Sequence, residues 1–174
     1  MIYAVSGQLS CVVPYEVAVG AIVDVQILYQ GQVSASGSVN IVASAPGVFT
    51  VDASGSGQGS ILNQDSSLNS PSNPAARGSI VSVYATGEGQ TNPPGVDGKP
   101  DGSPAPVPAA QPVTAMVGGL PANVVYAGGA PGLVAGVLQV NVQIPQSAMT
   151  GGAVPITISV GGVVSQANVT LAIK

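Results

Sequence analysis

The sequence predicts an all-β protein built as a sandwich or barrel, and three observations lead to that expectation. Apolar and polar residues alternate in several short runs, Gly-Gly, Gln-Gly and Asn-Pro pairs separate the runs, and no run carries a helical stripe over three turns. Alternation with period two is typical of a strand with one buried face, and the separating pairs favour turns. Many short strands with turns between them indicate a sandwich or barrel.

The clearest strand covers residues 138–144. Leu138, Val140, Val142 and Ile144 alternate there with amide side chains. Pro145 ends the strand, because proline has no amide hydrogen to donate to a sheet. Residues 146–149 leave room for one helical turn at most. The other expected strands are residues 23–29, 79–85, 111–117, 123–127, 154–160 and 164–173, with a hairpin that joins 48–52 to 60–63 across a Gly-rich loop.

The composition excludes several classes of partner. Only 6% of the 174 residues are charged, Lys and Arg total 3, and the net charge is −4. Nucleic-acid binding and docking on anionic lipid both need a basic surface, which this chain lacks. No apolar run reaches the ~18 residues that a membrane-spanning helix requires. The abundant Ser, Thr, Asn, Gln and Gly instead predict a polar, uncharged surface, as in extracellular bacterial β-modules.

The first quarter of the chain is a partial copy of the last third. Aligning Gln8 with Gln139 brings turn residues together as well as apolar ones, so that residues 1–43 resemble 126–173. Chance periodicity would not preserve the turn residues, so we expect an internal repeat. The same offset pairs Pro14 with Pro145, Gly20 with Gly151, Gly31 with Gly162, Cys11 with Val142, and Val23, Val25 and Ile27 with Val154, Ile156 and Ile158.

The repeat predicts a domain organisation of about one and a half domains. Residues 1–44 form a partial repeat without opening strands, 45–78 form a hairpin and an Asn/Ser/Pro-rich connecting loop, and 79–174 form the complete domain. An incomplete domain leaves strand edges and an apolar face uncovered. Three explanations stay open: the chain is a piece of a longer protein, the half domain packs on the complete one, or a neighbouring chain supplies strands in a swapped oligomer or filament.

The middle of the chain contains several long, mostly polar strings: Ala45-Pro-Gly-Val-Phe-Thr, Ile61-Leu-Asn-Gln-Asp, Leu68-Asn-Ser-Pro-Ser-Asn-Pro-Ala-Ala-Arg-Gly and Tyr84-Ala-Thr-Gly-Glu-Gly-Gln-Thr. These strings resemble the Solibacter-type uncharacterised C-terminal domain family of secreted acidobacterial proteins. The resemblance implies export and a position at the end of a larger protein, and no known activity. A looser resemblance to TIG-type immunoglobulin-like domains rests on Gly78-Ser-Ile-Val-Ser-Val-Tyr and Val117-Gly-Gly-Leu-Pro-Ala-Asn-Val-Val-Tyr. It implies an immunoglobulin-like β-sandwich.

The sequence predicts neither catalysis nor a cofactor. His is absent, so Ser-His-Asp and Cys-His arrangements are impossible, and the acidic residues are scattered. Cys11, which aligns with Val142, is expected to be a small buried hydrophobe. The only acidic loop that offers a start for a calcium site contains Asp97 and Asp101, with Glu88 nearby in sequence. Lys99 lies inside that loop, and its spacing matches no calcium loop, so a solvated loop is the simpler interpretation and we expect no metal.

Two long loops remain. Arg77, the only arginine, ends the loop 63–77, and its five donors suit it to bind loop carbonyls or an acid, a structural role. The Pro- and Gly-rich loop 90–111 is a candidate binding surface without aromatic residues. We therefore expect a secreted or cell-surface structural or adhesive module that assembles with other protein chains as a homo-oligomer or as part of a larger protein. The alternative is a glycan- or protein-binding accessory module.

Overall fold

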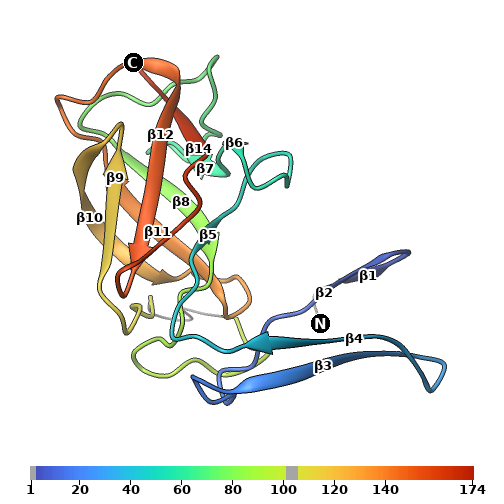
Figure 1. Cartoon of the computed structure of the whole chain (residues 1–174). Helices are drawn as coiled ribbons and strands as arrows, with labels where there is room; N and C mark the ends of the chain where they lie inside the picture. The colour runs from blue at the N-terminus through green and yellow to red at the C-terminus, as the bar shows by residue number, and fades with distance from the viewer. Residues whose placement is uncertain (1–2, 101–105) are drawn as a thin grey trace. The chain divides into compact units, whose positions relative to one another are not determined.

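The computed structural model describes residues 3–100 and 106–174 of the chain (Figure 1). The chain divides into two compact units, Met1–Ala43 and Ser44–Lys174. Every regular element of the described residues is a strand, so the expected all-β class is confirmed. None of the described residues forms a long apolar helix of the kind that crosses a membrane.

The C-terminal unit contains most of the strands and is one continuous sheet that follows the order β5-β8-β11-β10-β9-β12-β14-β6. Two short strands lie off this path, β7 beside β8 and β13 beside β12. The strand bounds are β5 Gly47–Val48, β6 Gly57–Gln58, β7 Ile61–Leu62, β8 Ile80–Thr86, β9 Val113–Val117, β10 Leu120–Gly129, β11 Val137–Gln143, β12 Gly151–Val160, β13 Val163–Val164 and β14 Val169–Ile173.

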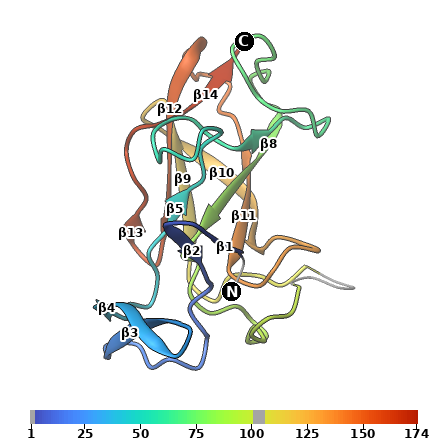
Figure 2. The same cartoon turned by 90° about the vertical axis from the view of Figure 1, so that its right-hand side faces the viewer.

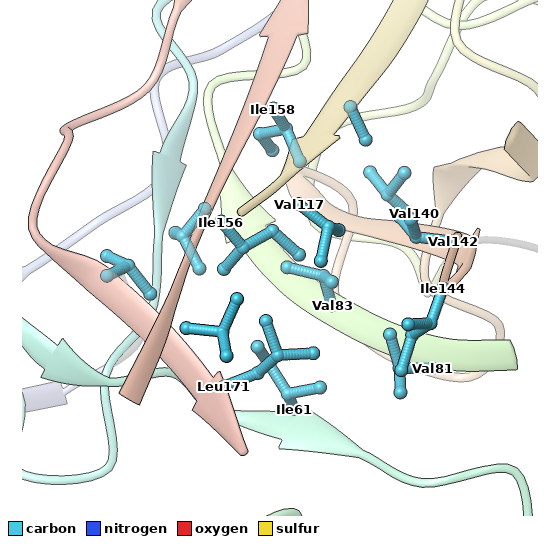
Figure 3. Packing of buried hydrophobic residues seen from close by; sticks show 14 of the residues in the cluster. Ile61, Val81, Val83, Val117, Val140, Val142, Ile144, Ile156, Ile158 and Leu171 are labelled. Atoms are coloured by element: carbon cyan, nitrogen blue, oxygen red, sulfur yellow. The ribbon is translucent and has the colours of Figure 1, made fainter. Parts of the chain in front are cut away.

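The sheet of this unit is curled (Figure 2), and its buried apolar residues form one core cluster. Along β11, Leu138, Val140 and Val142 are buried while the residues between them are more exposed, as the alternation predicts. The buried side chains of β12, β9 and β14 point toward those of β8 and β11 (Figure 3). The buried side chains on the first three strands include Ile156, Ile158, Val117 and Leu171. The buried side chains on β8 and β11 include Val81, Val83, Val140 and Val142.

One side-chain amide links β5 to the connection between β13 and β14. Gln166, between β13 and β14, donates from Nε2 to the carbonyl of Val48 in β5 at 2.6 Å and accepts from the Val48 amide at 2.9 Å. The amide group of the glutamine thus takes the place of a neighbouring strand. It satisfies both backbone groups of Val48 where the main-chain ladder stops.

The segment 45–78 belongs to the C-terminal unit instead of serving only as a connection. Its hairpin forms as expected, with Thr50 paired to Gly59, and Val48, Ile61 and Ala75 are buried in the core. These apolar side chains cover core surface that the strands after residue 79 would leave exposed. The gain from removing this apolar surface from water holds the segment against those strands. The single strand expected at 164–173 is divided into β13 and β14, because Ser165 turns its amide and hydroxyl to the backbone of Ile158.

The N-terminal unit consists of two hairpins. Strands β1 (Tyr3–Val5) and β2 (Gln8–Ser10) form the first, and β3 (Ile22–Tyr29) and β4 (Gln32–Asn40) form the second. The β3 strand matches the expected strand at 23–29. Within the described residues, each of these strands has a single sheet neighbour, its own hairpin partner.

Candidate interaction surface on the N-terminal unit

The hairpin of β3 and β4 has one apolar face and one face that is polar in its middle. Cross-strand pairing places Val23 opposite Val39 and Ile27 opposite Ala35, so that these residues share a side of the hairpin. The other side, which we call the polar face, carries Asp24 in its middle, and the Asp24 carboxylate accepts a hydrogen bond of 2.6 Å from the Ser38 hydroxyl. Toward the ends of β3 this side also carries the exposed apolar residues Ile22, Leu28 and Val33. We call the first side the apolar face and define it as Val23, Val25, Ile27, Tyr29, Ala35, Gly37 and Val39.

The N-terminal unit by itself leaves the apolar face partly exposed. Val25 is 45% exposed, Ile27 37% and Val39 44%. Ordinary surfaces carry single apolar residues, but a contiguous apolar face is typical of a contact with another chain or segment. Sequence periodicity predicts this face as the buried side of a strand, and the two hairpins of the N-terminal unit do not bury it fully.

The same hairpin occurs in the C-terminal unit as β12 and β13. Tyr29 pairs with Gln32 as Val160 pairs with Val163, and Leu28 pairs with Val33 as Ser159 pairs with Val164. Both turns use two residues with positive φ, Gln30 and Gly31 in one and Gly161 and Gly162 in the other. Such turns match the twist of the strands that they join. In β12, however, the residues that align with Val25 and Ile27 are buried at 0% and 1% exposure.

The two prolines of the repeat occupy similar turns. The carbonyl of Pro14 accepts a hydrogen bond from the Val17 amide at 3.3 Å, and that of Pro145 accepts one from Ala148 at 3.0 Å. Pro145 follows β11 as the sequence predicts, with one buried residue, Ile144, between the strand and the proline. Ala148 is buried and Val17 is only partly buried.

Cys11 is exposed, so the expectation of a small buried hydrophobe at this position is wrong. Its counterpart Val142 is buried because it packs in the hydrophobic core of the C-terminal unit. The strand before Cys11, β2, has only β1 beside it. Alignment with a core position therefore predicts burial only where the rest of the core is present.

The expected structural role of Arg77 is taken by asparagines. Arg77 is exposed, and among the described residues its guanidinium makes no hydrogen bond. Asn69, which is completely buried, bonds the backbone of Ala172 in β14, accepting from its amide at 2.7 Å and donating to its carbonyl at 2.9 Å. Asn63 and Asn73 extend this network within the loop 63–77. Arg77 stood out in the sequence because it is charged. The asparagines of the loop were the better indication of which side chains hold it.

The candidate calcium ligands do not form a cluster in the described structure. Glu88 is buried at 1% exposure and Asp97 is exposed, while Asp101 lies outside the described residues. No group of three His, Cys, Asp or Glu side chains occurs among the residues described. The ends of the loop 90–111 pair with each other, Thr91 with Ala109, and Pro108 also pairs with Gly128 of β10.

Two acids elsewhere stabilise turns. Hydrogen bonds from the Ser54 hydroxyl and amide hold the pKa of Asp52 below its ordinary value of 3.8. The Ser67 hydroxyl and amide lower the pKa of Asp65 in the same way. Both carboxylates are fully exposed. An acid whose pKa is lowered by turn hydrogen bonds is suited to cap the turn and is a poor proton donor at neutral pH.

An open depression of about 510 Å³ lies between the loop 63–77 and the start of β12. Pro71, Pro74, Gly152 and Lys174 are among its lining residues, and none of the lining residues is aromatic. Glycan sites usually present aromatic platforms, so this depression does not favour the glycan-binding alternative. No family model, curated protein or solved structure matches the chain.

Proposed function

We propose that the chain is a non-catalytic structural or adhesive module of a secreted or cell-surface protein, and that its N-terminal unit associates with other protein chains. One observation carries the proposal. Val25 and Ile27 of β3 are 45% and 37% exposed, while the aligned residues of β12 are buried. At roughly 25 cal/mol per Å² of apolar area removed from water, covering such a face is favourable.

The proposal includes an architecture for both units. We take the curled sheet of the C-terminal unit as an immunoglobulin-like, TIG-type sandwich, and the N-terminal unit as a partial repeat of it. The matching turns of the two hairpins, and the two matching residue pairs next to each turn, support the repeat. The resemblance to the Solibacter-type C-terminal domain family supports export and attachment to a larger protein.

The mode of association follows from the open edge of β3. A strand edge with free amides and carbonyls accepts another strand, and chains that add strands in this way form swapped oligomers or filaments. The low charge of the chain, 6% of residues, leaves little electrostatic repulsion between copies.

Sedimentation velocity over a range of concentrations tests the proposal. We expect the full chain to form concentration-dependent oligomers and Ile27→Asp to abolish them, because the new carboxylate would lie in the contact. Gln26→Asp is the matched control, since Gln26 pairs with Ser36 on the polar face and tolerates a charge. A chain that stays monomeric at every concentration, with both variants identical to it, would refute self-association through this face.

A further inference from the structure

The free edge of β3 has a counterpart in the C-terminal unit that is occupied. There, β12 has β14 on one side and β9 on the other. Strand β9 runs antiparallel to β12 over five residue pairs, from Ile156 with Val117 to Val160 with Val113. In the N-terminal unit, β4 occupies one side of β3, and no described strand occupies the other.

We propose that this edge of β3 is an acceptor site for one antiparallel strand with the residue pattern of β9, supplied by another protein chain. The inference rests on the proposed function and specifies its mode. The repeat fixes the register, with Val25 opposite the residue equivalent to Val117, Ile27 opposite that of Ala115, and Tyr29 opposite that of Val113. The pairing restores the main-chain hydrogen bonds that the edge lacks.

The structure of β9 also defines the chemistry of the donor strand. Ala115 and Val117 are buried, and Thr114 and Met116 are exposed. Ala115, which lies opposite Ile158, is small and 3% exposed. A donor for β3 therefore needs a small residue opposite Ile27, β-branched residues at the two flanking apolar positions and uncharged residues on the apolar side.

The apolar face next to this edge accounts for specificity. A donor strand in the proposed register places its apolar residues on the same side as the apolar face of the hairpin. A donor strand shifted by one residue would place those apolar residues on the polar face instead. Asp24 and Ser38 lie on that polar face. The shifted register thus places apolar residues beside a carboxylate and leaves the apolar face uncovered.

A synthetic peptide of residues 111–119, which contains β9, tests the proposal with the full chain. We expect saturable binding by fluorescence anisotropy. Ala115→Glu in the peptide should weaken binding at least about tenfold, because the charge would be buried. Thr114→Glu in the peptide, which places the same charge on the exposed side, is the matched control and should bind as the unchanged peptide does.

Disulfide trapping tests the register. In a Cys11→Ser background, Ile27→Cys should form a disulfide with an Ala115→Cys peptide at least about tenfold faster than Leu28→Cys does, because directly opposite residues are the closest. Equal trapping at both positions would overturn the register.

The outcomes separate this inference from the proposed function. A chain that self-associates through Ile27 but does not bind the peptide overturns the strand-acceptor inference and leaves the proposed function in place. A chain that neither self-associates nor binds the peptide overturns both. Peptide binding that survives Ile27→Asp places the site elsewhere and also overturns the inference.

Discussion

The side chain of Gln166 pairs with both backbone groups of Val48, at 2.6 and 2.9 Å, and so joins residues 118 positions apart in the chain. Asn69 does the same for Ala172, at 2.9 and 2.7 Å and 103 positions away. Each amide offers one donor and one acceptor in the geometry of a peptide group, which allows it to replace a strand where the ladder ends.

Replacing Gln166 by Ala should destabilise the C-terminal unit. The change leaves the partly buried amide and carbonyl of Val48 without these partners, at a cost of about 1–3 kcal/mol. Urea unfolding measures the change. Gln143→Ala is the matched control, because Gln143 is exposed and makes a single side-chain hydrogen bond of 3.2 Å to Gly78. Equal effects of the two substitutions would contradict the role assigned to Gln166.

Asn69→Ala should have a larger effect, about 2–4 kcal/mol, because it removes bonds to buried groups. The Asn69 side chain contacts Asn63, Gln58 and both backbone groups of Ala172, and it is completely buried. Asn123→Ala on the exposed side of β10 should change the unfolding free energy little. A wild-type urea midpoint for Asn69→Ala would show that the loop 63–77 is not held through this residue.

The aligned isoleucines of the repeat offer a matched pair of substitutions. Ile158→Ala should cost about 2–5 kcal/mol, since it opens a cavity in a closed core. Ile158 is 1% exposed and Ile27 37%. Ile27→Ala should therefore leave the thermal unfolding of the C-terminal unit unchanged and weaken only association. A similar loss of stability from both variants in dilute monomer would mean that Ile27 is buried within the chain.

The exposed acids predict a modest acid sensitivity. Asp52 and Asp65 have pKa values below 3.8 in the folded chain, so their hydrogen bonds stabilise it above about pH 4. This contribution is lost as the pH falls through the lowered values, because the unfolded state then binds protons more readily. Urea midpoints at about pH 5 and pH 3 should differ less in Ser54→Ala than in wild type. If the difference between the two urea midpoints is the same in Ser54→Ala and in wild type, the hydrogen bonds from Ser54 do not contribute to the acid sensitivity.

Sequence periodicity predicted much of the sheet but not its closure. Strands with alternating apolar residues, such as β11, were predicted within a residue or so, because one buried face leaves a clear pattern. Strand β4 was not, since its sequence QVSASGSVN is mostly small and polar. The burial of Asn69 depends on contacts with β14, which no local pattern contains. The candidate surface itself was predicted through the repeat, whereas the exposure of Cys11 was not.

The links that Gln166 makes to β5 and Asn69 makes to β14 use neutral groups on both sides of each contact. Added salt weakens attractions between exposed charges, but it has little effect on hydrogen bonds between amides. Unlike a seam made of ion pairs, these contacts should therefore hold equally well in fresh water and in brine.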